Sequence, residues 1–123
     1  MRLVLAALLL LPATVAGADL VPEVPSQFIG DWNAHVADCG TGDNDSALRI
    51  GENEIAYYES NGPIKAVVSH GRYEIALILE LSGEGETWIT TEHFKLSPGG
   101  ERLTSVNQPG DGYVRYRCPA QRM

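Results

Sequence analysis

The chain has 123 residues, of which 16 are acidic and 9 basic, and its formal net charge is −7 at pH 7. This length fits a single domain with one modest core. The negative charge repels nucleic acids and anionic membrane surfaces, and no basic stripe interleaved with aromatic residues is present. A nucleic-acid-binding function is therefore not expected.

Residues 1–18 have the pattern of a cleavable signal peptide. Arg2 is the only charge, residues 3–11 are nine apolar residues in a row, and Pro12 ends that run. Small residues at 16–18 fit the site that a signal peptidase reads, so we expect cleavage near Ala18. Nine apolar residues are too few to span a bilayer as a helix. We predict a periplasmic or secreted protein, the alternative being an uncleaved N-terminal anchor.

Cys39 and Cys118 are the two cysteines of the chain, and both would survive export. An oxidising compartment favours a disulfide between them, whereas two unpaired thiols are the alternative. No C-x-x-C pattern of a redox or zinc site is present. Because the bridge would close nearly the whole mature domain, the chain-entropy model gives it an effect of roughly 4 kcal/mol.

The segments between turn signals indicate an all-β domain over residues 28–123. Residues 19–27 form a proline-spaced, extended leader, and turn signals then recur at roughly ten-residue intervals. Hydrophobicity alternates with period two between the turns. We predict eight short antiparallel strands: 28–35, 47–51, 54–59, 63–69, 72–82, 86–96, 101–106 and 112–118. Short connections favour a meander, closed into a small barrel or flattened into a sandwich.

The alternation also assigns side chains to faces. Five large residues are expected to fill the barrel interior: Trp32, Leu77, Leu79, Trp88 and Phe94. Glu92 falls on the apolar face of its strand, which indicates a bulge nearby. In the last strand, the apolar face is assigned to Val114, Tyr116 and Cys118, and the opposite face to Arg115 and Arg117.

The motif Gly30-Asp31-Trp32 opens the first predicted strand. A Gly-x-Trp at this place, followed by a meander, resembles the calycin group of barrels, which includes the lipocalins and avidins. That resemblance implies an arginine near the last strand that lies over the tryptophan. Arg115 or Arg117 could take this role in the present sequence.

A closer resemblance is to a family of short exported bacterial proteins of unknown function. It covers most of the mature chain and implies a lipocalin-like barrel, without an established activity. Four segments carry it: residues 28–32 with Cys39 following, residues 57–60, residues 83–88 and residues 115–119.

In a strict meander, alternate loops lie at the same end of the barrel. The loops 36–46, 60–62, 82–86 and 107–112 would therefore share one end, which contains acidic residues and no Lys or Arg. Loops on a rigid scaffold commonly carry binding residues, although acids in loops also serve solubility. The candidate binding residues at this end are Glu59, Glu84, Glu86, Trp88 and Asp111.

We expect no cofactor and no metal site. The run Asp43-Asn44-Asp45-Ser46 offers oxygen ligands for calcium, but it lacks the rest of an EF-hand loop. A turn held by hydrogen bonds from an Asn or Asp side chain is the better interpretation of this run. The three histidines have no cysteine, histidine or carboxylate at metal-ligand spacing.

Three functions fit these observations. The first is a non-catalytic binding module for a small ligand or a protein partner, at the acidic mouth, the outer wall or a cavity. The second is an inhibitor of an exported hydrolase such as a protease, with the leader 19–27 entering the cleft of the enzyme. The third is a carboxylate-based hydrolase, which requires Glu59 and Glu86 within about 10 Å of each other.

The disulfide also tests the strand order. In a strict meander, Cys118 lies roughly 20 Å from the end of the first strand. A disulfide requires Cα atoms within about 7 Å. If Cys39 and Cys118 are bonded, residues 36–39 must fold back along the last strand.

Overall fold

The computed structural model describes residues 17–42, 44–107, 110 and 112–120. The predicted signal peptide lies outside the described residues, apart from Gly17 and Ala18 at its end. Within the described ranges, no helix is long and apolar enough to cross a membrane.

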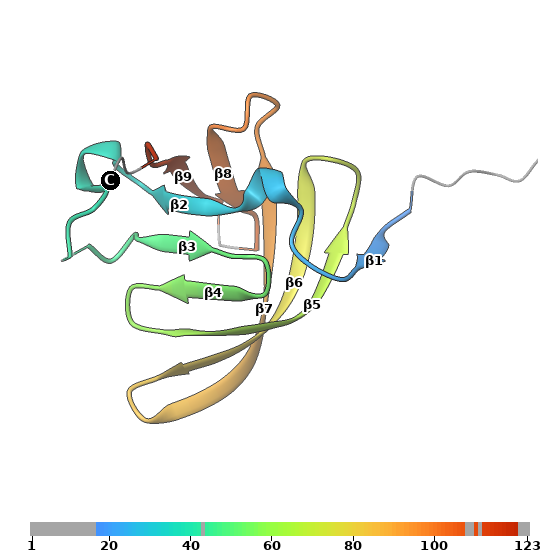
Figure 1. Cartoon of the computed structure of the whole chain (residues 1–123), viewed down its shortest axis with the longest axis horizontal. Coiled ribbons are helices and arrows are strands. Elements are labelled where there is room, and N and C mark those ends of the chain that lie inside the picture. Colours follow the sequence, from blue (N-terminus) through green and yellow to red (C-terminus); the bar gives the residue numbers. More distant parts are fainter. Residues whose placement is uncertain (1–16, 43, 108–109, 111, 121–123) are drawn as a thin grey trace, which may run out of the picture.

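The described chain forms nine strands and two short 3-10 helices (Figure 1). The strands are β1 (Asp19–Val21), β2 (Gly30–Asn33), β3 (Leu48–Ile50), β4 (Glu54–Tyr57), β5 (Asn61–Ser69), β6 (Glu74–Gly83), β7 (Glu86–Leu96), β8 (Arg102–Ser105) and β9 (Tyr113–Arg117). The helices are η1 (Ser26–Phe28) and η2 (Val36–Asp38).

Strands β2 to β9 form a closed antiparallel barrel. Each strand pairs with the next in the chain, and the circle closes where β2 pairs with β9, with Trp32 opposite Arg117. The predicted eight-stranded meander and its closure into a barrel are confirmed, whereas the sandwich alternative is not formed. Strands β6 and β7 are the longest, and their hairpin extends past the shorter strands (Figure 1).

The predicted leader, residues 19–27, lies against the barrel. Strand β1 pairs with the end of β5 through Asp19 and Ser69, and the Val24 N–H donates to the Glu52 carbonyl at 3.0 Å. Val24 is buried, and η1 places Phe28 in the core with no exposed surface. The leader and η1 therefore cover the end of the barrel that carries the β3–β4 turn. Any insertion of the leader into an enzyme would first have to break these contacts.

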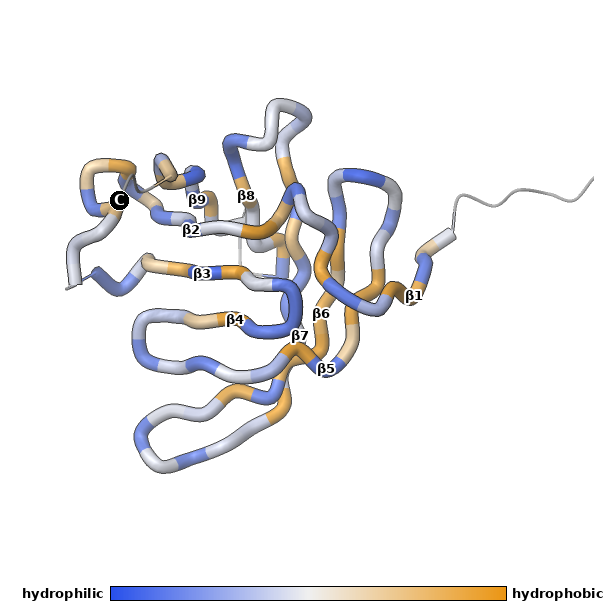
Figure 2. The backbone as a smooth tube through the Cα atoms, in the orientation of Figure 1, coloured by the Kyte–Doolittle hydropathy of each residue, from blue (hydrophilic) through white to orange (hydrophobic). Residues whose placement is uncertain are grey.

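Apolar side chains fill the barrel above this covered end. Trp32, Leu77, Leu79 and Phe94 are at most 1% exposed, as their alternation predicted. Trp88 does not fill the interior as expected, because it lies near the tip of the long hairpin and is 39% exposed. Figure 2 shows hydrophobic stretches along β5 and β6 and hydrophilic residues at several turns.

Two glycines allow the β4–β5 segment to press against β6. A Cβ atom on Gly62 would lie 1.8 Å from the Glu80 carbonyl oxygen. A Cβ atom on Gly83 would lie 2.4 Å from the Glu59 carbonyl oxygen. No side chain fits at these distances, so the close approach of the backbones requires glycine at both positions. This approach fixes the β4–β5 turn against the β6–β7 hairpin.

The bulge expected near Glu92 and the faces expected for β9 are both wrong. The β6–β7 ladder runs without a bulge through Leu77 and Glu92, so the Glu92 side chain points into the barrel. In β9 the faces are reversed, because Arg115 is buried, whereas Val114 and Tyr116 are exposed on the outer wall. The irregularity in the barrel lies instead in β5, between residues 64 and 66.

The predicted disulfide between Cys39 and Cys118 is present, with a Cα–Cα distance of 5.8 Å. After β2, the chain turns back through η2, so that Cys39 returns to the side of β2. Cys118 continues the β9 pairing and donates its backbone N–H to the Asp31 carbonyl at 2.8 Å. The 36–39 segment therefore folds back, as the bond requires, and is not a simple tip loop.

Candidate functional site

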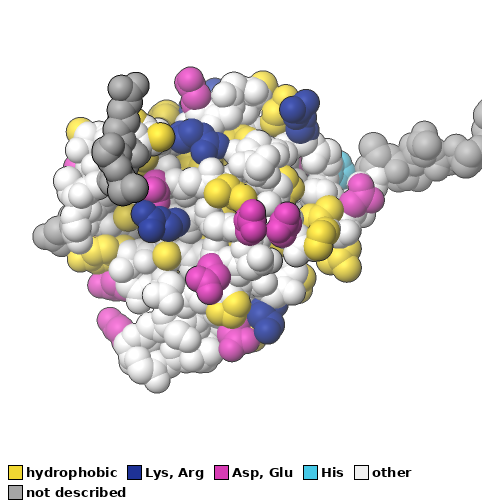
Figure 3. All heavy atoms as spheres, viewed as in Figure 1, with side chains coloured by type: hydrophobic (Ala, Val, Ile, Leu, Met, Phe, Trp, Pro, Cys, Tyr) yellow, Lys and Arg dark blue, Asp and Glu magenta, His cyan; other side chains and the backbone are white. Residues whose placement is uncertain are grey.

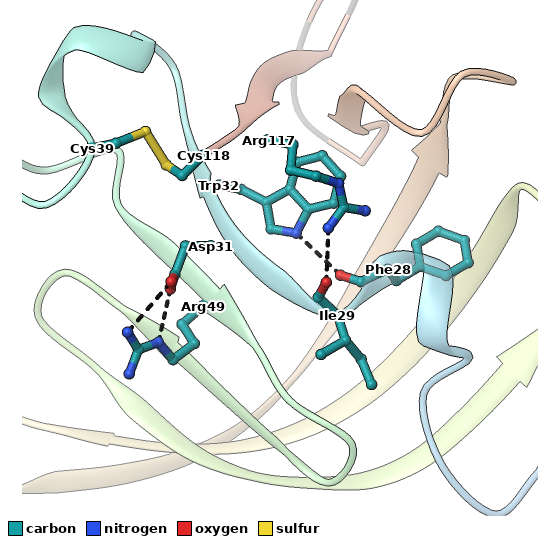
Figure 4. A network of polar contacts seen from close by, with 8 residues as sticks. All are labelled: Phe28, Ile29, Asp31, Trp32, Cys39, Arg49, Arg117 and Cys118. Carbon is teal, nitrogen blue, oxygen red and sulfur yellow. Dashed lines mark hydrogen bonds and ion pairs between the residues drawn. A yellow bond between two sulfur atoms is a disulfide. The ribbon is translucent and has the colours of Figure 1, made fainter. Parts of the chain in front are cut away.

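Arg117 and Trp32 form a cluster at the covered end (Figure 4). The guanidinium of Arg117 lies over the Trp32 ring, 4.2 Å from its centroid, and the indole Nε1 donates to the Phe28 carbonyl at 3.1 Å. Arg117 also donates to the carbonyls of Gln27, Ile29 and Gly100. The arginine over the tryptophan that the calycin resemblance implies is therefore Arg117, and its contacts fasten the leader and the β7–β8 turn to the barrel.

At the opposite end of the barrel, the described residues line a cleft of about 710 Å³. Its walls come from the β4–β5 turn, the β6–β7 hairpin and the loop after β8, and include Tyr57, Glu59, Trp88, Thr90, Glu92 and Asn107. A second hollow of about 370 Å³ shares Asp45, Tyr57 and Glu92 with the first and continues to Arg115. The two hollows form one mouth, which is large enough for a small molecule.

The floor of this mouth is polar, in contrast to the apolar interior below it. The Tyr57 hydroxyl donates to Glu92 Oε1 at 3.1 Å, and the Ser105 hydroxyl donates to the same oxygen at 3.2 Å. Arg115 Nη1 donates to Ser105 Oγ at 3.4 Å, and Arg115 Nε donates to the Ser46 carbonyl at 2.9 Å. We call Tyr57, Glu92, Ser105 and Arg115 the mouth network.

The environment of the mouth network alters two pKa values. Burial raises the pKa of Tyr57 far above that of a free phenol, and the charge of Glu92 and its hydrogen bond act in the same direction. Burial lowers the pKa of Arg115, whereas the charge of Glu92 is among the interactions that oppose this shift. Tyr57 is therefore a neutral hydrogen-bond donor at neutral pH, and Arg115 stays cationic because arginine starts from such a high pKa.

The structure places some of the predicted binding residues at the mouth and others away from it. Glu59 and Trp88 line the mouth. Glu84 and Glu86 are exposed at the β6–β7 turn and are not among the lining residues. Asp111 lies outside the described residues. Acidic side chains are spread over the face in Figure 3 and do not gather into one patch there.

Sequence reasoning did not select Tyr57, Glu92, Ser105 or Arg115 as site residues. One signal was present, an acid on the apolar face of β7. Arg115 gave none, because alternation assigned it to the polar face of β9, and only the barrel places Glu92 and Arg115 on its inner wall.

In its described part, residues 44–46, the run at 43–46 forms a turn. Asn44 Oδ1 accepts from the Ser46 N–H at 3.1 Å and from the Ser46 hydroxyl at 2.8 Å, which confirms the predicted side-chain turn. Among the described residues, no three His, Cys, Asp or Glu side chains are grouped so that they could hold a metal ion.

Fold and site together define a small closed meander barrel with a covered end, a polar mouth and an arginine that lies over the tryptophan of β2. Comparison of the chain with protein-family models, with curated proteins and with solved structures found no match.

Proposed function

We propose that this chain is an exported, non-catalytic binding module that takes a small polar ligand at the mouth of its barrel. The observation that carries the proposal is the polar floor of the mouth. Glu92 and Arg115 are 7% and 8% exposed, although apolar side chains fill the rest of the interior. Burying charged groups is costly, so a barrel selected for stability alone would have no reason to keep them there.

Two further features support binding at this place. The mouth is concave and combines aromatic surface from Tyr57 and Trp88 with a few convergent polar groups, which is the usual composition of a ligand site. The close approach of Gly62 and Gly83 to neighbouring backbone holds one wall of the mouth in place. A preformed site binds with a smaller loss of conformational entropy. The disulfide fits export to an oxidising compartment.

The test is retention of a ligand by the full chain, expressed with its signal peptide and purified from the compartment to which it is exported. Native mass spectrometry would show an added mass on the folded protein. Thr90→Phe places a large side chain in the mouth, and the matched control Ile89→Phe places it on the exposed outer face of the same strand.

We expect the added mass to be absent from Thr90→Phe and present in Ile89→Phe. Where no ligand survives purification, a library of small metabolites should raise the melting temperature of the wild type and of Ile89→Phe only. Retention of the ligand by Thr90→Phe, or no response of any protein to any compound, would refute binding at the mouth.

A further inference from the structure

The mouth network holds one negative and one positive group, and each has a hydrogen-bonding atom to spare. Both protein contacts of Glu92 are made by Oε1, and Oε2 has no partner among the described residues. No buried side-chain oxygen or nitrogen in the described part of the chain lacks a hydrogen bond. Oε2 is therefore the Glu92 oxygen that the described residues leave without a protein partner, and Glu92 lines both hollows.

The same reasoning applies to Arg115. Its Nε and Nη1 donate to the Ser46 carbonyl and to Ser105, whereas Nη2 has no partner among the described residues. Nη2 is therefore the guanidinium nitrogen that the described residues leave without a protein partner, and Arg115 lines the second hollow. The guanidinium thus offers a charge-assisted donor to whatever enters the mouth.

The two charges are close but do not neutralise each other directly. Ser105 Oγ bridges them, since it donates to Glu92 Oε1 and accepts from Arg115 Nη1. The carboxylate and the guanidinium are therefore separated by a single hydroxyl, and they do not form an ion pair of their own. A ligand with an ammonium group and a carboxylate a few bonds apart could reach Oε2 and Nη2 at once.

The rim of the mouth adds further negative charge. Asp45 and Glu59 line the hollows, whereas Arg115 is the only basic residue among the described lining residues. Trp88 contributes a partly exposed aromatic ring at the same rim. Carboxylates and an aromatic face together favour an additional cationic group.

From this geometry, and given binding at the mouth as proposed above, we infer that the ligand is a small zwitterion with an additional positive charge, the chemistry of a basic amino acid. Its ammonium group bonds Glu92 Oε2, its carboxylate bonds Arg115 Nη2, and its cationic side chain lies toward Asp45 and Glu59.

Four related probes separate these contributions. L-lysine carries all three charged groups, cadaverine lacks the carboxylate, 6-aminohexanoate lacks the α-ammonium and L-norleucine lacks the side-chain charge. Binding to the full, oxidised chain is measured by calorimetry and by Trp fluorescence at neutral pH and low salt. We expect lysine to bind most tightly, cadaverine and 6-aminohexanoate at least about tenfold more weakly, and norleucine in between.

The variant Arg115→Gln removes the cation but keeps a hydrogen-bonding side chain. We expect it to weaken lysine binding at least about tenfold and to leave cadaverine binding within about twofold, a difference that general misfolding would not produce. Equal affinities for lysine and cadaverine, or equal losses of both in the variant, would overturn the inference. If none of the four probes binds while the Thr90→Phe experiment shows a ligand in the mouth, the zwitterion is wrong and the binding module stands.

Discussion

Replacement of Arg117 by methionine tests whether the cluster over Trp32 holds the covered end of the barrel together. Methionine keeps much of the apolar stem of arginine and removes the cation and its donors. Three carbonyl oxygens lose a charged donor, and the Trp32 ring loses the cation 4.2 Å from its centroid.

The magnitude follows from these contacts. A hydrogen bond from a charged group contributes about 1.5–3 kcal/mol, and a cation over an aromatic ring about 0.5–2 kcal/mol. Arg117 is only partly buried, so water replaces some of the lost bonds. We therefore expect Arg117→Met to lower the free energy of unfolding by about 3–5 kcal/mol, a large part of the roughly 5–15 kcal/mol of a typical domain.

The assay is urea unfolding of the oxidised protein, followed by Trp fluorescence and by circular dichroism. The matched control is Arg49→Met, because Arg49 pairs with Asp31 at the surface, where their side chains are 73% and 47% exposed. An exposed pair of this kind contributes about 0–1 kcal/mol. If the two methionine variants lose similar amounts of stability, the role that we assign to Arg117 is wrong.

Three further outcomes are expected. Serine at both Cys39 and Cys118 should lower the free energy of unfolding by about 4 kcal/mol in urea, and an unchanged urea midpoint would contradict the loop-closure argument. Burial raises the pKa of Tyr57, so its neutral form stabilises the fold at pH values below the unfolded-state pKa of about 10. This stabilisation is lost as the pH rises above the unfolded-state pKa toward the higher folded-state pKa. The free energy of unfolding should therefore fall less steeply with alkaline pH in Tyr57→Phe than in the wild type. Gly62→Ala should cost more than about 2 kcal/mol in thermal unfolding, whereas Gly99→Ala, where a Cβ meets nothing within 4 Å, should cost less than about 1 kcal/mol.

The strands were predictable because their turns and their alternation are local properties. The segment predicted over 86–96 coincides with β7. The bounds of the other barrel strands lie within two residues of their predicted ends. The number of strands allowed a barrel or a sandwich, and the pairing of β2 with β9 that closes the barrel joins strands far apart in the chain, so no local signal showed it. The leader was harder to place, because its extended residues 19–21 give no local sign that they pair with β5.

The faces of β9 were misassigned for a physical reason. Alternation counts arginine as polar and valine and tyrosine as apolar, and so it turns Val114 and Tyr116 inward. Arg117 is nevertheless directed inward, because its guanidinium lies over Trp32 and its donors find backbone carbonyls. Arg115 lies two residues earlier and must share that face. One satisfied arginine therefore sets the orientation of the whole strand.

That orientation brings Arg115 to the Ser105 hydroxyl that also bonds Glu92, and a double-mutant cycle can test whether the two charges act together. In Glu92→Met, Arg115 loses a negative charge that acts on it, and in Arg115→Met the carboxylate loses its positive counterpart. Each single variant leaves a buried charge uncompensated, so we expect each to be less stable than the wild type by about 1–3 kcal/mol in urea.

The double variant removes both charges and places methionine at positions 92 and 115 in the floor of the mouth. Replacing a buried charge pair by apolar residues of similar volume is commonly neutral or stabilising, so the double variant should be more stable than either single variant. It should also lose the retained ligand. Recovery of stability together with loss of binding would mean that ligand binding requires the two charges, whereas the fold does not. Simple addition of the two single costs would show instead that Glu92 and Arg115 act independently, and it would remove the main argument for a binding site at the mouth.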